Sequence, residues 1–222
     1  MDLHNAVVGR FGVHLDAASP IELQGSRFRS LPRLLQAIEA KSVVEVGVFQ
    51  GKFTKALCEW LPETKIYGID PWLDYDEYVE SSVDGGQGGL DSNYQKAKDR
   101  LSSFGIERCQ LIRATSMEAV SLFDDESLDC VFIDGNHSFR YVIDDIASWS
   151  KKVRVGGMVA GHDYWNSYED NRGGMVVNDS TKLRRLCQVK DAVDAWTTTE
   201  GIAPWFLLTA DRCPTWFWMR EK

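Results

Sequence analysis

Two apolar stretches of the sequence end in residues that can bind metal ions or transfer protons. Asp134 and His137 follow the stretch 128–133, and His162 and Asp163 follow the stretch 158–161. Carboxylates and imidazoles are common ligands of divalent cations and common acid–base groups. If the stretches are adjacent parallel strands, about 4.8 Å apart, Asp134, His162 and Asp163 converge on one cation. The alternative is that each residue is a satisfied polar group at a strand end.

A second candidate site lies in residues 45–51, EVGVFQG. Gly47 and Gly51 permit a tight turn and a close approach of the backbone to a ligand. Because Phe49 stands where a pyrophosphate would require a small residue, the motif argues against dinucleotide binding. Asp70 ends another apolar stretch 25 residues after Glu45 and is suited to accept the two hydroxyls of a ribose. A glycine-bounded turn without a ligand, and a solvated loop aspartate, are the alternatives.

The apolar spacing along the chain predicts the elements that position these residues. Helical spacing alternates with short β-branched stretches, which predicts a mostly parallel sheet covered by helices on both faces. The stretches 204–210 and 215–219 are joined too closely for a crossover helix and must form an antiparallel hairpin. Strands are expected at 43–46, 65–70, 109–114, 128–134 and 158–163, and helices near 31–38, 52–60, 93–104, 115–123, 142–153 and 186–200.

Length and composition limit the remaining possibilities. The 222 residues suit a single domain, 1–222, with an N-terminal arm over 1–25 and long loops over 72–92 and 164–179. The aromatic residues in these loops either line a lid over a ligand or pack the loops down; they are Trp72, Tyr75, Tyr78, Tyr164, Trp165 and Tyr168. A net charge of −8 argues against nucleic-acid binding, and no apolar stretch is long enough for a membrane span. No secretory pattern begins the sequence, and the five cysteines suit reduced thiols, so a cytoplasmic location is expected.

In their order and spacing, these motifs resemble those of class I S-adenosylmethionine-dependent methyltransferases. The specific similarity is to methyltransferase family 24 and to macrolide-sugar and other small-molecule O-methyltransferases. It covers about residues 31–219 and rests on the segments 45–51, 68–72, 134–137 and 161–164, with Trp149 and Gly156-Gly157 between the last two. The resemblance implies a Rossmann-like, seven-stranded, mostly parallel sheet with helices on both faces and a C-terminal antiparallel hairpin.

The resemblance also implies a binding role for each cofactor residue. Glu45, Gly47 and Gly51 would border the methionine part of S-adenosylmethionine, and Phe49 belongs to the same motif. Asp70 would hold the ribose hydroxyls. Near the adenine, the resemblance places Thr115 and Ser116, neither of which is acidic. Asp134 is expected to be both a cofactor-binding and a catalytic residue.

The catalytic roles implied by the resemblance centre on the Asp/His residues. Asp134, His162 and Asp163 match positions that bind a divalent metal in metal-dependent members, and His137 matches a general base. Because imidazole is a poor ligand for Mg²⁺, His162 favours Mn²⁺, Zn²⁺ or Fe²⁺, unless it lies outside the coordination shell or no metal binds. The expected cofactors are S-adenosylmethionine and a divalent metal, Mg²⁺ or Mn²⁺. The expected partner is a small-molecule hydroxyl acceptor, a sugar or a natural product.

Several alternatives stay open at this point. A metal-dependent oxygenase or hydrolase could use the same Asp/His cluster, and a non-catalytic binding module could retain the fold. Cofactor binding distinguishes the first alternative from a methyltransferase, and turnover distinguishes the second. For His137, the alternative to a base is a cap on the following helix. The sequence leaves a homo-oligomer open.

Overall fold

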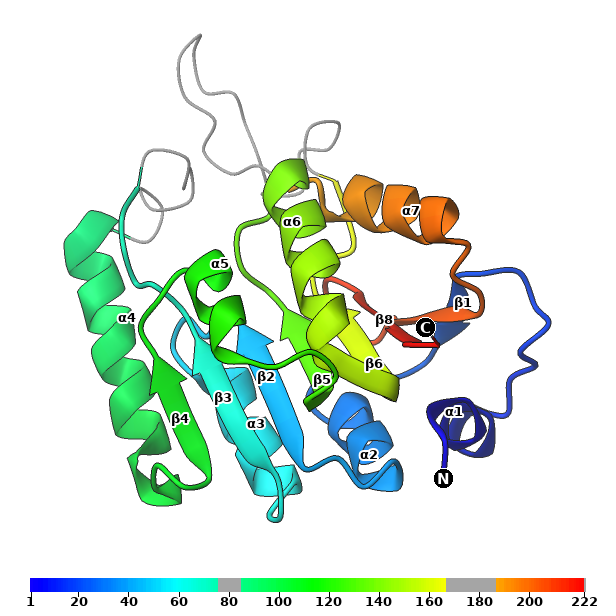
Figure 1. Cartoon of the computed structure of the whole chain (residues 1–222), viewed down its shortest axis with the longest axis horizontal. Coiled ribbons are helices and arrows are strands. Elements are labelled where there is room, and N and C mark those ends of the chain that lie inside the picture. Colours follow the sequence, from blue (N-terminus) through cyan, green and yellow to red (C-terminus); the bar gives the residue numbers. More distant parts are fainter. Residues whose placement is uncertain (76–84, 167–186, 222) are drawn as a thin grey trace, which may run out of the picture.

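The computed structural model describes residues 1–75, 85–166 and 187–221, in which an eight-stranded sheet lies between two layers of helices (Figure 1). The order of strands across the sheet is β1-β7-β8-β6-β5-β2-β3-β4. Within the described residues, β8 alone runs antiparallel to its neighbours. In chain order the strands are β1 (Ile21–Leu23), β2 (Ser42–Val46), β3 (Lys65–Ile69), β4 (Cys109–Ile112), β5 (Leu128–Ile133), β6 (Val153–Gly161), β7 (Trp205–Leu208) and β8 (Thr215–Met219).

Alternation of side chains along the strands builds a separate core on each face of the sheet. Val43 packs into the core that includes α1, α2 and α3, whereas its neighbour Val44 packs into the core that includes α6 and α7. The helices are α1 (Leu3–Phe11), α2 (Ser30–Ala37), α3 (Lys52–Trp60), α4 (Gly86–Leu101), α5 (Ser116–Ala119), α6 (Phe139–Trp149) and α7 (Val189–Glu200), and the 3₁₀ turns 102–104, 120–122 and 150–152 follow α4, α5 and α6.

The predicted fold class is confirmed, and the structure adds one strand to it. All seven expected strands are present, with β7 and β8 as the antiparallel hairpin. The eighth strand, β1, comes from the segment expected to be an N-terminal arm, and it pairs in parallel with β7. The same segment contains helix α1, whose N-cap Asp2 accepts a hydrogen bond from the N–H of Asn5.

Some element boundaries differ from those expected. Helix α4 begins at Gly86, so residues 86–92 are helical and the expected loop over 72–92 is shorter. Strand β6 begins at Val153, before the Gly156-Gly157 pair rather than after it. Its register with β5 jumps between Leu128 and Cys130, and Gly156, at φ +80°, lies in the irregular part.

Trp72, which was expected in a lid or in loop packing, is buried. Its indole Nε1 donates to the carbonyl oxygen of Phe49 at 2.8 Å, and its ring packs on Tyr94 of α4, with ring centroids 4.7 Å apart. The expected aromatic residues Tyr78 and Tyr168 lie outside the described residues. Trp72 therefore joins the turn after β2 to α4 instead of covering a ligand.

The composition argues against membrane spans and favours reduced cysteines. Throughout the described ranges, no helix combines the length and apolar character needed to span a membrane. All five cysteines are free, and four of them are buried.

One buried carboxylate holds the amino ends of three strands together. Asp129 Oδ2 accepts hydrogen bonds from the N–H groups of Lys41 and Ser42 at 2.7 and 2.9 Å, and Oδ1 pairs with Nε of Arg154 at 2.6 Å. Burial raises the pKa of the Asp129 carboxyl, but these hydrogen bonds and the charge of Arg154 outweigh burial and lower the pKa overall.

We predict that Asp129→Asn lowers the free energy of unfolding at pH 7 by about 1.5–3 kcal/mol, the range for hydrogen bonds to a charged group. Because the pKa is lowered in the folded state, this stabilisation is complete above the unfolded pKa of about 3.9 and is lost as the pH falls through the folded value. Urea unfolding between pH 3 and pH 7 measures the difference. Asp125→Asn, which removes an exposed partner of Lys152, is the control and should stay near wild type. A constant difference at every pH would contradict the prediction.

Candidate active site

The candidate residues lie at the carboxyl ends of five adjacent strands, β6, β5, β2, β3 and β4, and hydrogen bonds continue the ladder past several of these ends. The N–H of Asp134 donates to the carbonyl of Val46 at 2.7 Å, and the N–H of His162 donates to that of Ile133 at 3.0 Å. On the other side of β2, the N–H of Gly47 donates to Ile69 at 2.8 Å. The main chain at these positions is therefore fixed by the sheet itself.

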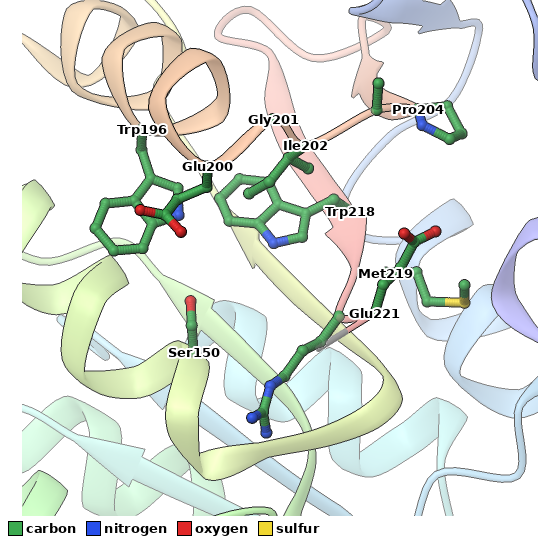
Figure 2. Close-up of a pocket in the computed structure, with 11 residues that line it drawn as sticks. Ser150, Trp196, Glu200, Gly201, Ile202, Pro204, Trp218, Met219 and Glu221 are labelled. Carbon is green, nitrogen blue, oxygen red and sulfur yellow. The ribbon is translucent and has the colours of Figure 1, made fainter.

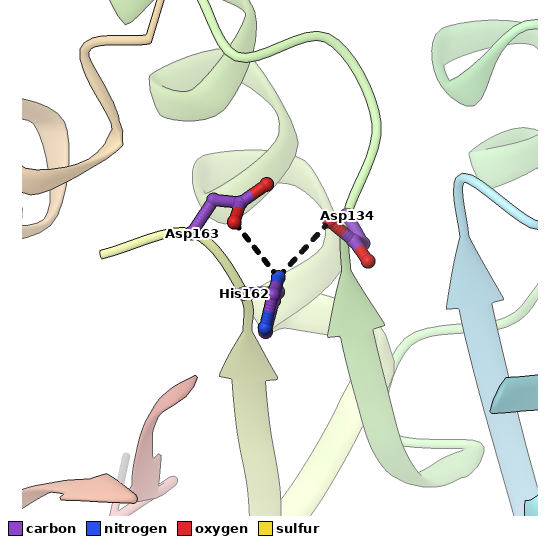
Figure 3. Close-up of side chains that lie close together, drawn as sticks. All are labelled: Asp134, His162 and Asp163. Atoms are coloured by element: carbon purple, nitrogen blue, oxygen red, sulfur yellow. Dashed lines mark ion pairs between the residues drawn. The ribbon is translucent and has the colours of Figure 1, made fainter. Parts of the chain in front are cut away.

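Asp134, His162 and Asp163 lie together, as two adjacent strand ends predict (Figure 3). His162 Nδ1 is 3.0 Å from Asp163 Oδ1 and 3.8 Å from Asp134 Oδ1. One ligand atom from each of the three residues lies within 4.8 Å of the other two. The side chains of His162 and Asp163 are nine-tenths buried.

His137 contacts the same two carboxylates. Its Nε2 is 3.2 Å from Asp163 Oδ2 and 3.6 Å from Asp134 Oδ1. A cap on α6 was the alternative role for His137. At the start of α6, the N–H of Phe139 donates to Oε1 of Gln188. Asp163 thus has one oxygen beside each imidazole, which orients both rings.

Arg27, which the sequence analysis did not single out, also contacts this cluster. Its Nη1 donates to Asp134 Oδ2 at 2.8 Å. Arg27 follows β1, and its partner lies 107 residues away in the sequence. No spacing or motif could have indicated this contact, because it depends on the pairing of β1 with β7.

The positive groups around the two carboxylates favour their ionised forms. Burial raises the pKa of Asp134, but the charges of His162 and Arg27 and the nearby His137 lower it overall. For Asp163, burial is likewise outweighed by His162 and His137, and the pKa falls far below its usual range. Of these two carboxylates, Asp134 is also paired with the guanidinium of Arg27.

The donor set fits a divalent cation. With metal–ligand bonds of about 2.0–2.2 Å, adjacent ligands lie about 3.0–3.5 Å apart, close to the 3.0 and 3.8 Å separations here. Metal ligation requires neutral imidazoles and ionised carboxylates, so a bound cation would replace the positive charge of the imidazoles beside Asp134 and Asp163. Mixed oxygen and imidazole ligands suit Mn²⁺, Zn²⁺ or Fe²⁺ better than Mg²⁺.

The glycine turn after β2 lies directly against the strand end that carries Asp134. Gly47 has φ +93°, and a Cβ there would be 2.0 Å from the carbonyl oxygen of Asp134. Gly51, at φ +72°, begins α3 and faces Ala97 of α4. Only glycine permits both the backbone conformation and the close approach at position 47.

Asp70 holds this turn with both of its carboxylate oxygens. Oδ2 accepts from the N–H of Phe49 and Oδ1 from the N–H of Trp72, each at 2.8 Å. The Phe49 side chain itself is exposed. A role of Asp70 in holding ribose hydroxyls stays a prediction.

Glu45 lies buried beneath the turn. Its Oε2 accepts a hydrogen bond from Oγ1 of Thr54 at 2.5 Å. Burial raises the pKa of Glu45 to about 8, so this carboxyl is mostly protonated at pH 7.

The side chains of Thr115 and Ser116 have partners within the protein. Thr115 forms the predicted capping box with Glu118. Ser116 Oγ donates to Asp145 and accepts from Nε1 of Trp149 at 2.8 Å. Asp145, which the sequence analysis missed, is buried, and burial raises its pKa to about 7. Proximity of Thr115 and Ser116 to an adenine stays a prediction.

A separate cavity of about 190 Å³ lies away from the candidate residues, where α7 and β8 end (Figure 2). Trp196, Ile202 and Trp218 are among its lining residues. Because Met219 pairs with Met158, this cavity lies toward the amino end of β6, opposite the Asp/His cluster.

Solved structures with the same fold include two O-methyltransferases and one candidate O-methyltransferase, each with low sequence identity to this chain. The O-methyltransferase TomG of Streptomyces achromogenes, in complex with S-adenosylmethionine, is 16% identical, with a TM-score of 0.58 over 98% of this chain and 89% of that chain. A Bacillus cereus O-methyltransferase in complex with S-adenosylhomocysteine is 12% identical, with a TM-score of 0.58 over 98% and 88%. A candidate caffeoyl-CoA O-methyltransferase of Staphylococcus aureus is 14% identical, with a TM-score of 0.62 over 86% and 81%.

A family model provides the decisive comparison. Residues 44–164, more than half of the chain, match methyltransferase family 24, described as a methyltransferase domain. The chain belongs to this methyltransferase family. The resemblance seen in the motifs is thus confirmed, as is the expected class, an S-adenosylmethionine-dependent methyltransferase. No curated protein matches the sequence significantly.

We predict that the stability of this methyltransferase responds to Glu45→Gln in a pH-dependent way. A folded pKa of about 8 against an unfolded value near 4.3 means that ionisation increasingly disfavours the folded state as the pH rises between them. Glutamine cannot ionise, and its amide oxygen can still accept from Thr54. The stability of Glu45→Gln relative to wild type should therefore rise from pH 5 to pH 8 and then level off, as measured by urea unfolding. A difference independent of pH would show that Glu45 is not protonated in the folded protein.

Proposed function

We propose that this methyltransferase transfers a methyl group from S-adenosylmethionine to a hydroxyl of a small molecule, a sugar or a natural product. A divalent cation at Asp134, His162 and Asp163 and a proton acceptor at His137 complete the proposal. O-methyltransferase is the activity named for TomG and for the Bacillus cereus protein, which were solved with S-adenosylmethionine and S-adenosylhomocysteine, respectively.

The observation that carries this proposal is the contact between the glycine turn and the Asp/His cluster. Gly47 lies so close to the carbonyl oxygen of Asp134 that a Cβ would be 2.0 Å from it. A ligand bound along the turn therefore lies beside the carboxylates and His137. Methyl transfer requires this juxtaposition of methyl donor and acceptor, since alignment supplies most of the catalysis.

The cofactor residues have separate tasks in this proposal. Asp70 accepts the ribose hydroxyls, and Gly47 and Gly51 permit the backbone to approach the methionine part. Phe49 offers an exposed ring beside the bound cofactor, and Glu45 supports the turn from below. Thr115 and Ser116, after β4, border the adenine. When bound, S-adenosylmethionine supplies a methyl group that is already activated by a sulfonium.

The Asp/His cluster handles the acceptor hydroxyl. When bound, a divalent cation supplies a positive charge that lowers the pKa of a coordinated hydroxyl. Asp134 and Asp163 hold that charge in place. The His137 imidazole, whose Nε2 lies 3.2 Å from Asp163 Oδ2, takes the hydroxyl proton. The water-poor setting, with nine-tenths of each imidazole side chain buried, strengthens these interactions.

The cofactor proposal predicts a binding defect in Asp70→Ala. Loss of charged hydrogen bonds to the ribose should weaken the binding of S-adenosylhomocysteine by about 1.5–3 kcal/mol, roughly 10- to 150-fold in Kd. Calorimetric titration of the folded variant measures this change.

The control for Asp70→Ala is Trp72→Phe, which removes the indole donor to Phe49 but keeps the carboxylate. A much smaller effect in Trp72→Phe separates ribose binding from loosening of the turn. Unchanged affinity in Asp70→Ala would end the ribose assignment, and no binding of S-adenosylhomocysteine to wild type would overturn the proposed function.

The proton-acceptor proposal predicts that His137→Ala lowers turnover by about 10²- to 10⁴-fold, the usual contribution of general base catalysis. Affinity for S-adenosylhomocysteine should remain near wild type, because His137 lies outside the glycine turn. Gln188→Ala is the matched control, since Gln188 contacts the same turn at the start of α6 without supplying an imidazole. Equal losses of turnover in both variants would favour a structural role for His137.

A further inference from the structure

Arg27 is held in a fixed position beside the cluster. Its guanidinium carbon lies 5.1 Å from the ring centroid of Phe28 and 5.8 Å from that of Phe53. Its backbone N–H donates to Oδ2 of Asp211, which follows β7, at 2.6 Å. These contacts hold the guanidinium in place beside the Asp/His cluster.

The neighbouring backbone also limits movement of this segment. The N–H of Thr209 donates to the carbonyl of Leu23, and the N–H of Ala210 donates to that of Gly25, both at 3.0 Å. A Cβ at Gly25 would lie 2.4 Å from Oγ of Ser30. The segment between β1 and α2 is thus tied to the β7–β8 hairpin on one side and packed against α2 on the other.

Arg27 divides the two oxygens of Asp134 between different partners. Oδ2 is paired with Arg27, whereas Oδ1 faces His137 and His162 at 3.6 and 3.8 Å. With Oδ2 engaged, Asp134 presents only Oδ1 to the interior of the cluster. A cation bound to Oδ1 lies on the order of 5 Å from the guanidinium, within range of strong repulsion.

We propose that Arg27 is a positioning residue that makes Asp134 a single-oxygen ligand and weakens the hold of the site on its divalent cation. This inference rests on the proposed cation site at Asp134, His162 and Asp163. The physical reason is that the guanidinium competes with the cation for the same carboxylate and repels it. Without Arg27, Asp134 could use both carboxylate oxygens and would bind the cation more tightly. The protein would then no longer fix which oxygen of Asp134 binds the cation.

The proposal predicts that Arg27→Met binds Mn²⁺ about tenfold more tightly than wild type. A role confined to folding would predict the opposite, since loss of a structural contact leaves a binding site unchanged or weaker. Arg27→Lys keeps the charge and should stay within about threefold of wild type. Calorimetric titration with MnCl₂ gives each dissociation constant, and thermal unfolding identifies any variant that does not fold.

The matched control is Arg29→Met, which removes the same charge from an exposed position two residues away. It should bind Mn²⁺ like wild type, because general electrostatics contributes little across solvent. Adding Asp134→Asn to Arg27→Met should abolish the gain, which locates the effect at this carboxylate.

Each result supports or overturns the inference. Tighter binding confined to Arg27→Met supports it. Unchanged or weaker binding in Arg27→Met, an equal gain in Arg29→Met, or no Mn²⁺ binding in any folded variant overturns it. The same preparations are titrated with S-adenosylhomocysteine, so a failure of the cation inference is distinguished from a failure of the proposed methyl transfer.

Discussion

The central part of the site depends on hydrogen bonds that continue the parallel ladder past the ends of β2, β5 and β6. The N–H groups of Gly47, Asp134 and His162 all donate to the last carbonyl of an adjacent strand. If one of these peptide groups moved, its N–H would lose the carbonyl acceptor that the adjacent strand provides. Side chains attached to this edge therefore start from fixed points, and the close approach at Gly47 follows from the same constraint.

Glu45 lies beneath the site, and its raised pKa explains why it does not add a third negative charge there. Asp134 and Asp163 both have lowered pKa values, so two negative charges occupy a small buried volume. A third charge on Glu45 would repel them, and burial instead raises the pKa of Glu45 to about 8. The protonated Glu45 still accepts a hydrogen bond from Thr54. The cluster thus keeps a negative charge that suits one dication, with Arg27 as a partial counterweight.

The sequence predicts the part of this structure that depends on periodicity and strand order. Apolar stretches ending in Asp134 and His162 suffice to bring these residues together, because adjacent parallel strands end at one edge. The capping box of Thr115 and Glu118 is local and was equally predictable. Arg27 was not, since its contact with Asp134 requires the pairing of β1 with β7, and β1 has only three residues. Asp145 was missed for a similar reason, because its contact with Ser116 joins two helices on one face of the sheet.

Backbone strain is present in both halves of the site, the turn after β2 and the Asp/His cluster. In the described residues, five non-glycine residues have positive φ, and Phe49, Trp72 and Asp163 are three of them. Conformations of this kind cost on the order of 1–3 kcal/mol each and persist only where the surroundings enforce them. Phe49 and Trp72 are enforced by Asp70 and by each other, so the turn after β2 is preformed before any ligand binds.

The other half of the site depends on segments outside the central strands. Arg27 approaches Asp134 from the segment after β1, which is held by residues that follow β7. A substitution there is expected to change the charge around Asp134 while Asp70 keeps its hydrogen bonds to the turn. The turn and the charge around Asp134 are therefore controlled by different contacts, although the two parts of the site touch at Gly47.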